Sequence, residues 1–358
     1  MSRQLKKRSG LLIISLFLFS FVSFSQFKDI DFLRSAPADG VKYLQAYLTP
    51  YANAFGAGLN GGWYNTAKPH KLGGFDITIS TSVGIVPSSA QTFDVTKIGL
   101  SSAVSGTGMA STIAGPKTAG PLLAYKVNGV TLASFNAPKG INWKYVPVPT
   151  AQVGIGLPFG TELKVRFIPK IKIQDGDISL WGVGLLHSLT QYLPGNKVLP
   201  FDVSLFGGYT KLMADVPMGL DPDPAVAKAY TTVNPATAFD NQNLKVTVAA
   251  LNVGAIASLN LPVITFSGGV GYTKTNTTMA LSGNFPLPVA VLTPLPHAEY
   301  NDSGVKKGSD FPKLEIKNFS GLRANIGFRL KLAIVTIHFD YTRAQYNVLT
   351  TGLGFSFR

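Results

Sequence analysis

The sequence has no cysteine among its 358 residues, and only 14% of them are charged. The lack of cysteine excludes a disulfide framework, and the low charge leaves few side chains to cover an ordinary water-exposed surface. After residue 25, no apolar run approaches the roughly 18 to 20 residues of a membrane-spanning helix. Intrinsic disorder is excluded too, because a chain with 46% hydrophobic residues collapses. These absences indicate a membrane protein without membrane helices.

Residues 1–25 have the pattern of a secretory signal peptide. A basic start precedes an apolar run at 11–24, and small residues stand at Ser23 and Ser25, so we expect cleavage before Gln26. The alternative is a short anchor helix, but the apolar run is too short to span a bilayer. The absence of cysteine also excludes a lipoprotein anchor. The basic start consists of Arg3, Lys6, Lys7 and Arg8, so cleavage lowers the formal charge to 14 − 4 = +10.

Apolar and polar residues alternate with a period of two along most of the mature chain. At 75–85, apolar side chains face one side and polar or small ones the other, which is typical of a strand between two environments. Most such runs are near or above the roughly 9 to 11 residues of a transmembrane strand. The twelve candidate strands are 52–63, 72–86, 91–101, 149–157, 161–173, 178–188, 200–213, 242–258, 263–275, 319–330, 333–344 and 347–358.

The connections between these segments support a barrel. The three long links, 102–148, 214–241 and 276–318, all fall on one side. Even strand numbers with short turns on one side and long loops on the other are typical of outer-membrane barrels. A soluble β-sandwich would also alternate, but the signal peptide, the low charge and the mean hydropathy of +0.21 favour the barrel. We therefore predict an all-β, transmembrane antiparallel barrel of about 12 strands, or alternatively 14, over residues 51–358, surrounded by lipid of the bacterial outer membrane.

The segment 26–50 has helical spacing instead of alternation. Val41, Leu44 and Leu48 recur three or four residues apart, and the pattern ends at Pro50. We predict a short helix there, which is either a plug or gate in the lumen or at its periplasmic mouth, or a helix lying against the periplasmic rim.

The predicted strand register turns several charged residues toward the lumen. The cations could attract an anionic solute, or they could pair with carboxylates such as Asp76, Glu162 and Asp202 and fill the lumen; we favour the second interpretation. His338 and Asp340 could also form half of a barrel-hydrolase site, but no serine lies at a fixed spacing from them in the sequence. The predicted lumen-facing residues are Lys164, Arg166, Lys170, Lys172, Arg323, Arg329, His338 and Asp340.

Motifs for catalysis are scarce. The sequence contains neither His-Glu-x-x-His nor Gly-x-Ser-x-Gly, which removes the common zinc-hydrolase and serine-hydrolase signatures. Residues 56–61 match the dinucleotide fingerprint, but no βαβ unit follows, so we interpret them as part of a flexible first strand. We expect no catalytic, cofactor or metal site and no enzymatic activity. Nucleic-acid binding is not indicated either, because the cations lie on barrel strands.

Several segments resemble outer-membrane families. The end of the chain, 352–357, resembles the C-terminal recognition strand of bacterial outer-membrane barrels, which implies contact with the barrel assembly machinery; Arg358 departs from that pattern. Five further segments carry a second resemblance: 56–70, 72–76, 158–163, 181–184 and 207–212. They resemble an uncharacterised Bacteroidota outer-membrane barrel family, and the resemblance spans most of the mature chain. This resemblance implies no particular activity.

Two functional hypotheses follow. A polar and apolar N-terminal segment before an even-stranded barrel resembles the architecture of the FadL-type channels for hydrophobic compounds. It implies a passive channel or transporter for a small hydrophobic compound, with residues 27–50 as the gate. The alternative is a non-transporting surface or structural barrel whose three long extracellular loops bind a partner.

Overall fold

The computed structural model describes residues 37–357 apart from 174–175, 195–198, 219–228, 235–236, 292–296, 312 and 317–318. The predicted signal peptide and the first part of the segment 26–50 lie outside the described residues. Within the described part, no helix combines the length and the apolar character that crossing a membrane requires.

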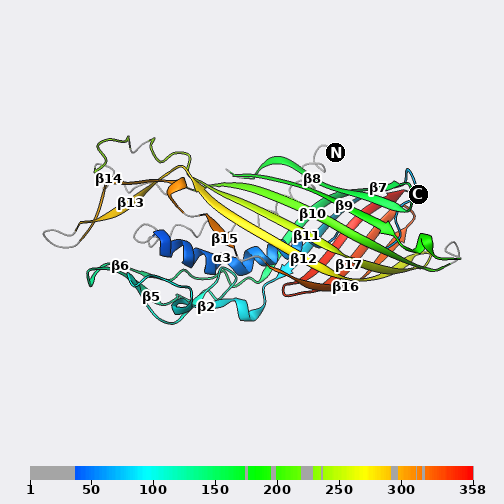
Figure 1. Ribbon diagram of the computed structural model, residues 1–358, viewed down its shortest axis with the longest axis horizontal. Coiled ribbons are helices and arrows are strands. Elements are labelled where there is room, and N and C mark those ends of the chain that lie inside the picture. Colours follow the sequence, from blue (N-terminus) through cyan, green and yellow to red (C-terminus); the bar gives the residue numbers. More distant parts are fainter. Residues whose placement is uncertain are drawn as a thin grey trace, which may run out of the picture.

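Ten antiparallel strands close into a barrel (Figure 1). The last strand pairs with the first from Phe75↔Phe357 onward, and β11 pairs with β12, so the ring has no open edge. An eleventh strand, β15 (Leu314–Ile316), pairs with the outer part of β12. The barrel strands are β1 (Phe75–Ile85), β7 (Tyr145–Leu157), β8 (Thr161–Ile173), β9 (Gly176–Ser188), β10 (Phe201–Pro217), β11 (Asn243–Asn260), β12 (Ile264–Ser282), β16 (Ser320–Leu332), β17 (Val335–Arg343) and β18 (Asn347–Phe357).

The predicted strand number of 12, with 14 as the alternative, is wrong, because two predicted strands do not form. Residues 52–63 belong mostly to the helix α3 (Pro37–Leu59), where small residues alternate with larger ones and imitate a strand pattern. Residues 91–101 form only β2 (Thr92–Asp94) and a short 3-10 turn, because the Asp94 side chain accepts a hydrogen bond from the Thr96 amide and caps that turn. The loss of two strands leaves the number even.

All three long links lie at one end of the barrel, as predicted. They span 86–144, 218–242 and 283–319, and we call this end the loop end. The opposite end, which we call the turn end, carries the C-terminal end of β18, the short turns 158–160, 261–263 and 333–334, and the longer link 189–200 (Figure 1). Three small sheets fold within the long links: β2 with β4 (Met109–Ser111); β3 (Val104–Ser105) with β5 (Leu122–Val127) and β6 (Val130–Asn136); and β13 (Asn284–Val291) with β14 (His297–Lys307).

The alternation of the strands separates an apolar outside from a mostly polar inside at the turn end. On β1, Ile77 and Ile79 are 46% and 47% exposed on the outside, whereas Thr78 and Ser80 are each 3% exposed inside. The side of each residue therefore follows from its parity, as the sequence predicts.

A β-bulge reverses this parity on β8. The pairing of β8 with β9 shifts between Ile168 and Ile171, around Pro169, which has no N–H for the strand ladder. Beyond the bulge, Lys170 and Lys172 are exposed on the outside. The prediction that these two lysines face the lumen is therefore wrong.

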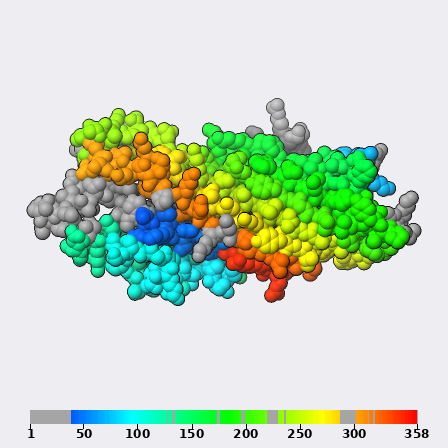
Figure 2. Space-filling model, viewed as in Figure 1, coloured from blue at the N-terminus to red at the C-terminus, as the bar shows by residue number. Residues whose placement is uncertain are grey.

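The helix α3 runs from the loop end into the barrel (Figure 1). It is longer than predicted, and Pro50 lies inside it instead of ending it. Leu48 is 4% exposed in the main apolar cluster, and Val41 and Leu44 pack against that cluster. The three predicted gate residues thus lie at the loop end, whereas the prediction placed them in the lumen or at the end that carries the short turns. Figure 2 shows the start of the helix, in blue, between cyan residues of the 86–144 link and orange residues of β14 and β15.

Candidate functional site

The candidate site is the interior of the barrel, where the chain from α3 to β1 contacts the wall. Glycines in the wall make room for this chain. A Cβ atom on Gly84 would collide with the backbone carbonyl of Ala54 in α3. A Cβ atom on Gly184 would lie 3.0 Å from the ring of Trp63, and one on Gly208 would lie 2.9 Å from it. Helix and wall are therefore in direct contact, with no space for larger wall residues.

Arg166 on β8 holds the end of the helix. Its Nη1 donates to the carbonyl of Leu59 and its Nη2 to the carbonyl of Gly61, both at 2.7 Å. Its guanidinium lies 3.7 Å from the ring centroid of Trp63, and Nε donates to Gln152 at 3.1 Å. The last carbonyls of a helix lack partners within the helix and carry partial negative charge, so a cation satisfies them well.

Arg323 on β16 completes this contact. Its Nη1 donates to the carbonyl of Asn60 at 2.8 Å, and its Nη2 donates to Thr342 at 3.0 Å. Asn252 donates to the same Asn60 carbonyl at 3.3 Å. We call Arg166 and Arg323 the arginine pair; both are buried, at 0% and 6% exposure. The arginine pair fixes the end of α3 from two strands of the barrel.

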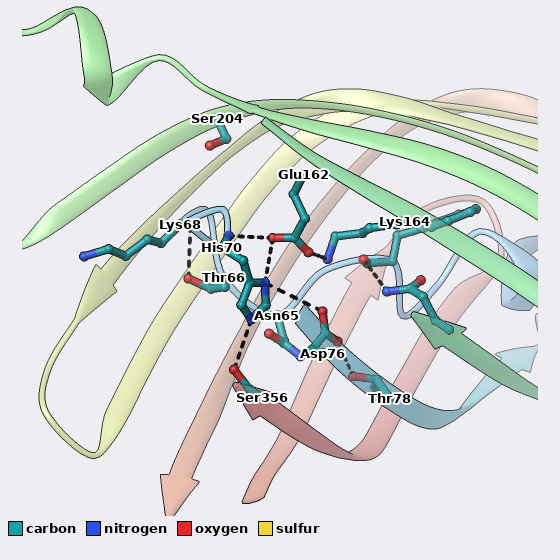
Figure 3. A network of polar contacts seen from close by, with 12 residues as sticks. Asn65, Thr66, Lys68, His70, Asp76, Thr78, Glu162, Lys164, Ser204 and Ser356 are labelled. Carbon is teal, nitrogen blue, oxygen red and sulfur yellow. Dashed lines mark hydrogen bonds and ion pairs between the residues drawn. The ribbon is translucent and has the colours of Figure 1, made fainter. Parts of the chain in front are cut away.

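A charged network holds the following segment near the turn end (Figure 3). His70 lies between Glu162 and Ser356: its Nδ1 is 3.0 Å from Glu162 Oε2, and its Nε2 is 3.1 Å from Ser356 Oγ. The His70 amide also donates to Glu162 at 2.9 Å, and Lys164 forms an ion pair with the other oxygen of that carboxylate. The network connects the chain before β1 to β8 and β18.

Three side chains of this region, those of His70, Asp76 and Glu162, are of types that can ligate a metal ion. Candidate donor atoms of His70, Asp76 and Glu162 lie within 4.8 Å of one another. However, the ammonium group of Lys164 already neutralises Glu162, and Asp76 accepts a hydrogen bond from Thr78 at 2.7 Å. We therefore interpret the cluster as the network that anchors residues 60–74.

The structure does not join His338 and Asp340 into a catalytic pair. Both face the lumen from β17, but the ring nitrogens of His338 have no hydrogen-bond partner within the described residues. Asp340 accepts from Asn325 at 2.6 Å and from Thr342 at 3.0 Å. Asn325 in turn accepts from the Tyr64 hydroxyl at 2.9 Å. Asp340 thus supports the chain that crosses the lumen.

The remaining predicted lumen residues also face inward. Lys164 pairs with Glu162, as the lumen-filling interpretation requires. Arg329 contacts the amide oxygen of Asn65 at 3.2 Å instead of a carboxylate. The sequence interpretation missed the partners that the chain between α3 and β1 supplies: Asn60, Trp63, Tyr64, Asn65 and His70. The signal available was the run of amides and aromatics between the helix and the first strand.

At the loop end, buried tyrosines tie α3 to the first long link. The Tyr47 hydroxyl donates to the carbonyl of Lys139 at 2.8 Å. Burial raises the pKa of Tyr47 to about 12. Burial, together with the neighbouring Tyr47, also raises the pKa of Tyr43.

The chain belongs to a family described as "Family of unknown function (DUF6588)", whose model matches residues 5–357. No curated protein matches the sequence. Among solved structures, the outer membrane protease OmpT from Escherichia coli is 7% identical, with a TM-score of 0.31, 79% of this chain and 97% of that chain covered. The attachment invasion locus protein Ail of Yersinia pestis is 7% identical, with a TM-score of 0.26. The match covers 80% of this chain and 98% of the Ail chain. The Ralstonia pickettii toluene transporter TbuX is 8% identical, with a TM-score of 0.22. The match covers 80% of this chain and 90% of the TbuX chain. The Bacteroidota source and the FadL-type resemblance stay predictions.

Proposed function

We propose that this member of the DUF6588 family is a bacterial outer-membrane barrel closed by its own N-terminal helix, and that its loop end is a folded surface that binds a partner. The proposal includes no catalytic step. It has three supports, which are the apolar exterior, the occupied lumen and the packing of the long links on the helix.

The exterior supports a membrane location. Every barrel strand exposes large apolar side chains on its outer face; among the most exposed are Leu322 at 82%, Ile326 at 69% and Val270 at 66%. Such a continuous apolar surface is unfavourable in water. Lipid accepts it, and a closed ring of strands also satisfies the backbone groups that lipid cannot.

The single observation that carries the proposal is that α3 belongs to the interior of the barrel and to the loop layer at once. Its C-terminal end is bonded to the arginine pair. Nearer its start, Asp39 accepts from the Ser101 amide at 2.8 Å, and the Tyr47 carbonyl accepts from the Ile113 amide at 3.1 Å. The helix that closes the lumen therefore also orders the loop surface.

Passive transport of a small hydrophobic compound is the second candidate, because the wall around α3 at the loop end is apolar. If the helix left the lumen, these side chains would line a passage suited to such a compound. Transport then requires breaking the contacts of the arginine pair. The buried wall residues are Val146, Val148, Ile178, Leu180, Leu212, Val246 and Val248.

Conductance and uptake distinguish the two candidates. We expect the full-length protein in planar bilayers to show no steady conductance, and its liposomes to take up a hydrophobic dye no faster than empty liposomes. A variant lacking residues 37–70, which are α3 and the chain held inside the barrel after it, should conduct. Dye uptake by the full-length protein well above that of empty liposomes would overturn the closed barrel in favour of the transporter.

A further inference from the structure

Charged side chains on the outer face of the barrel gather toward the loop end. By strand parity, six cations and two acids face outward, and all eight lie toward the loop end of their strands. On the turn-end side of these positions, no described barrel strand turns a lysine, arginine, aspartate or glutamate outward. We call the six cations the cation border: Lys170, Lys172, Lys211, Lys245, Lys274 and Arg343.

The border has an excess of positive charge. The two outward acids are Asp177 and Asp215. Lys170 forms an ion pair with Asp177 at 3.0 Å. In the described part of the chain, none of the other five cations forms an ion pair. The border therefore presents an excess of positive charge beside an apolar surface, and such charge attracts anions.

Aromatic side chains accompany these cations. Lys211 pairs across strands with Trp181, whose ring lies 5.5 Å from that of Tyr209. Lys274 follows Tyr272 by two residues on the same face of β12. Tyrosine and tryptophan beside lysine or arginine are typical of the level at which lipid headgroups begin. The cation border thus lies where the apolar exterior meets a headgroup layer.

Arg343 stands beside a groove with an apolar lining. The groove has a volume of about 610 Å³ and runs between β12, β16 and β17. Besides Arg343, its lining consists of the apolar or small residues Val270, Gly271, Leu322, Ala324 and Ala344, together with Arg323. Val270 and Leu322 expose 66% and 82% of their surfaces. An acyl chain fits such a lining, and a guanidinium offers a planar pair of donors to a phosphate. Both parts of a phospholipid therefore have a complementary surface here.

We propose that the cation border binds the phosphate groups of anionic lipid headgroups in the leaflet at the loop end, and that the groove beside Arg343 holds an acyl chain of one such lipid. The inference rests on the proposed function for its membrane location only. It adds a preference for anionic lipid. It also adds that this preference holds only in the leaflet at the loop end, because the turn end lacks a matching set of outward cations among the described strands.

Native mass spectrometry of the detergent-solubilised full-length protein tests the proposal. The probes are phosphatidylglycerol, whose phosphate is a net anion, phosphatidylcholine, whose phosphate is neutralised by choline, and palmitate, an anion without phosphate. We expect phosphatidylglycerol to be retained at least about tenfold more than either of the others, as a charged pairing of this kind provides. The variant Lys274→Gln/Arg343→Gln should lose this preference.

The matched control is Lys97→Gln/Lys126→Gln, which removes the same charge from exposed positions of the first long link and should keep the preference. Equal retention of phosphatidylglycerol and phosphatidylcholine, or equal loss in both double variants, would overturn the lipid site. Insertion into liposomes is scored separately by heat-modifiable migration. A protein that inserts without lipid preference contradicts only this inference, whereas one that does not insert contradicts the proposed function and this inference with it.

Discussion

Arg166 shows at the scale of one residue how a polar lumen becomes a structural core. Strand alternation places this residue inside, and the sequence interpretation assigns it a carboxylate partner. Its actual partners are two backbone carbonyls and an indole ring. No side-chain pattern reports backbone carbonyls as partners, so the direction of Arg166 was predictable and its role was not.

The change Arg166→Met tests this role. Methionine fills a similar volume but leaves the carbonyls of Leu59 and Gly61 without their donors. We expect the free energy of unfolding to fall by about 2 to 4 kcal/mol, because hydrogen bonds from a charged group are lost in a buried site. Denaturant titration measures the change. Phe167→Leu, on the outer face of the same strand, is the control; equal losses in both variants would refute the assigned role.

Gly84 sets how closely α3 approaches the wall. In Gly84→Ala, the added Cβ collides with the Ala54 carbonyl, so the helix must shift. We expect a loss of about 1 to 3 kcal/mol in the free energy of unfolding, as overpacking causes. The control is Gly207→Ala, where the nearest atom would be 3.8 Å away. A Gly84→Ala variant as stable as the control contradicts the close contact.

At the scale of elements, the same alternation of small and larger residues can occur in a strand or in a buried helix. The strands were largely predictable because each separates two environments, and alternation reports that separation directly. The C-terminal part of α3 was not, because it is surrounded by the barrel and has no polar face; Ala54, Gly56 and Gly58 are small for close packing, and they imitate a flexible strand. The bulge at Pro169 turns Lys170 and Lys172 to the outer face, and the alternation of the sequence alone does not predict where a bulge occurs.

The helix also provides a matched pair of variants. Leu48 is buried in the apolar cluster, whereas Leu44 is only partly buried against it. We expect Leu48→Asp to lower the free energy of unfolding by at least about 2 to 5 kcal/mol, because a carboxylate replaces a core leucine. Leu44→Asp should cost less. Limited proteolysis of the loop end should rank the two variants in the same order, and the reverse order would count against the helix as the core of the loop layer.

A contact between two long links gives a pH prediction. Asp302 on β14 accepts hydrogen bonds from the Thr231 hydroxyl at 2.6 Å and from the amides of Thr231 and Thr232. These bonds, led by the Thr231 hydroxyl, lower the pKa of Asp302 from 3.8 to about 2. A lowered carboxylate pKa stabilises the contact above pH 3.8, and this contribution disappears as the pH falls through about 2.

Amide-exchange protection of Thr231 and Thr232 measures this contact. Protection should be constant above pH 4 and should decline between about pH 4 and pH 2. In Asp302→Asn, the pH dependence should vanish. Protection that is lost above pH 4, or that persists unchanged below pH 2, is incompatible with a carboxylate acceptor.

At the scale of the whole molecule, the closed antiparallel barrel and the common side of the three long links were predictable, since both follow from alternation and link length. The strand number and the path of the N-terminal segment were not. They depend on contacts between α3, the arginine pair and the wall, which join residues more than 100 positions apart, as in Arg166 to Leu59. Local patterns carry no record of such pairings.

The central claim, a barrel closed by its own helix, is tested most directly by labelling a single introduced cysteine, because the chain has none of its own. Ser82 faces the lumen with 0% exposure, and Ser102 is exposed in the first long link. A charged, water-soluble maleimide applied to the folded protein should label Ser102→Cys quickly and leave Ser82→Cys unlabelled. Deleting residues 37–70, which include the Gly61 that covers Ser82, should expose Ser82→Cys. Labelling of Ser82→Cys in the full-length protein at the rate of Ser102→Cys would contradict the closed lumen.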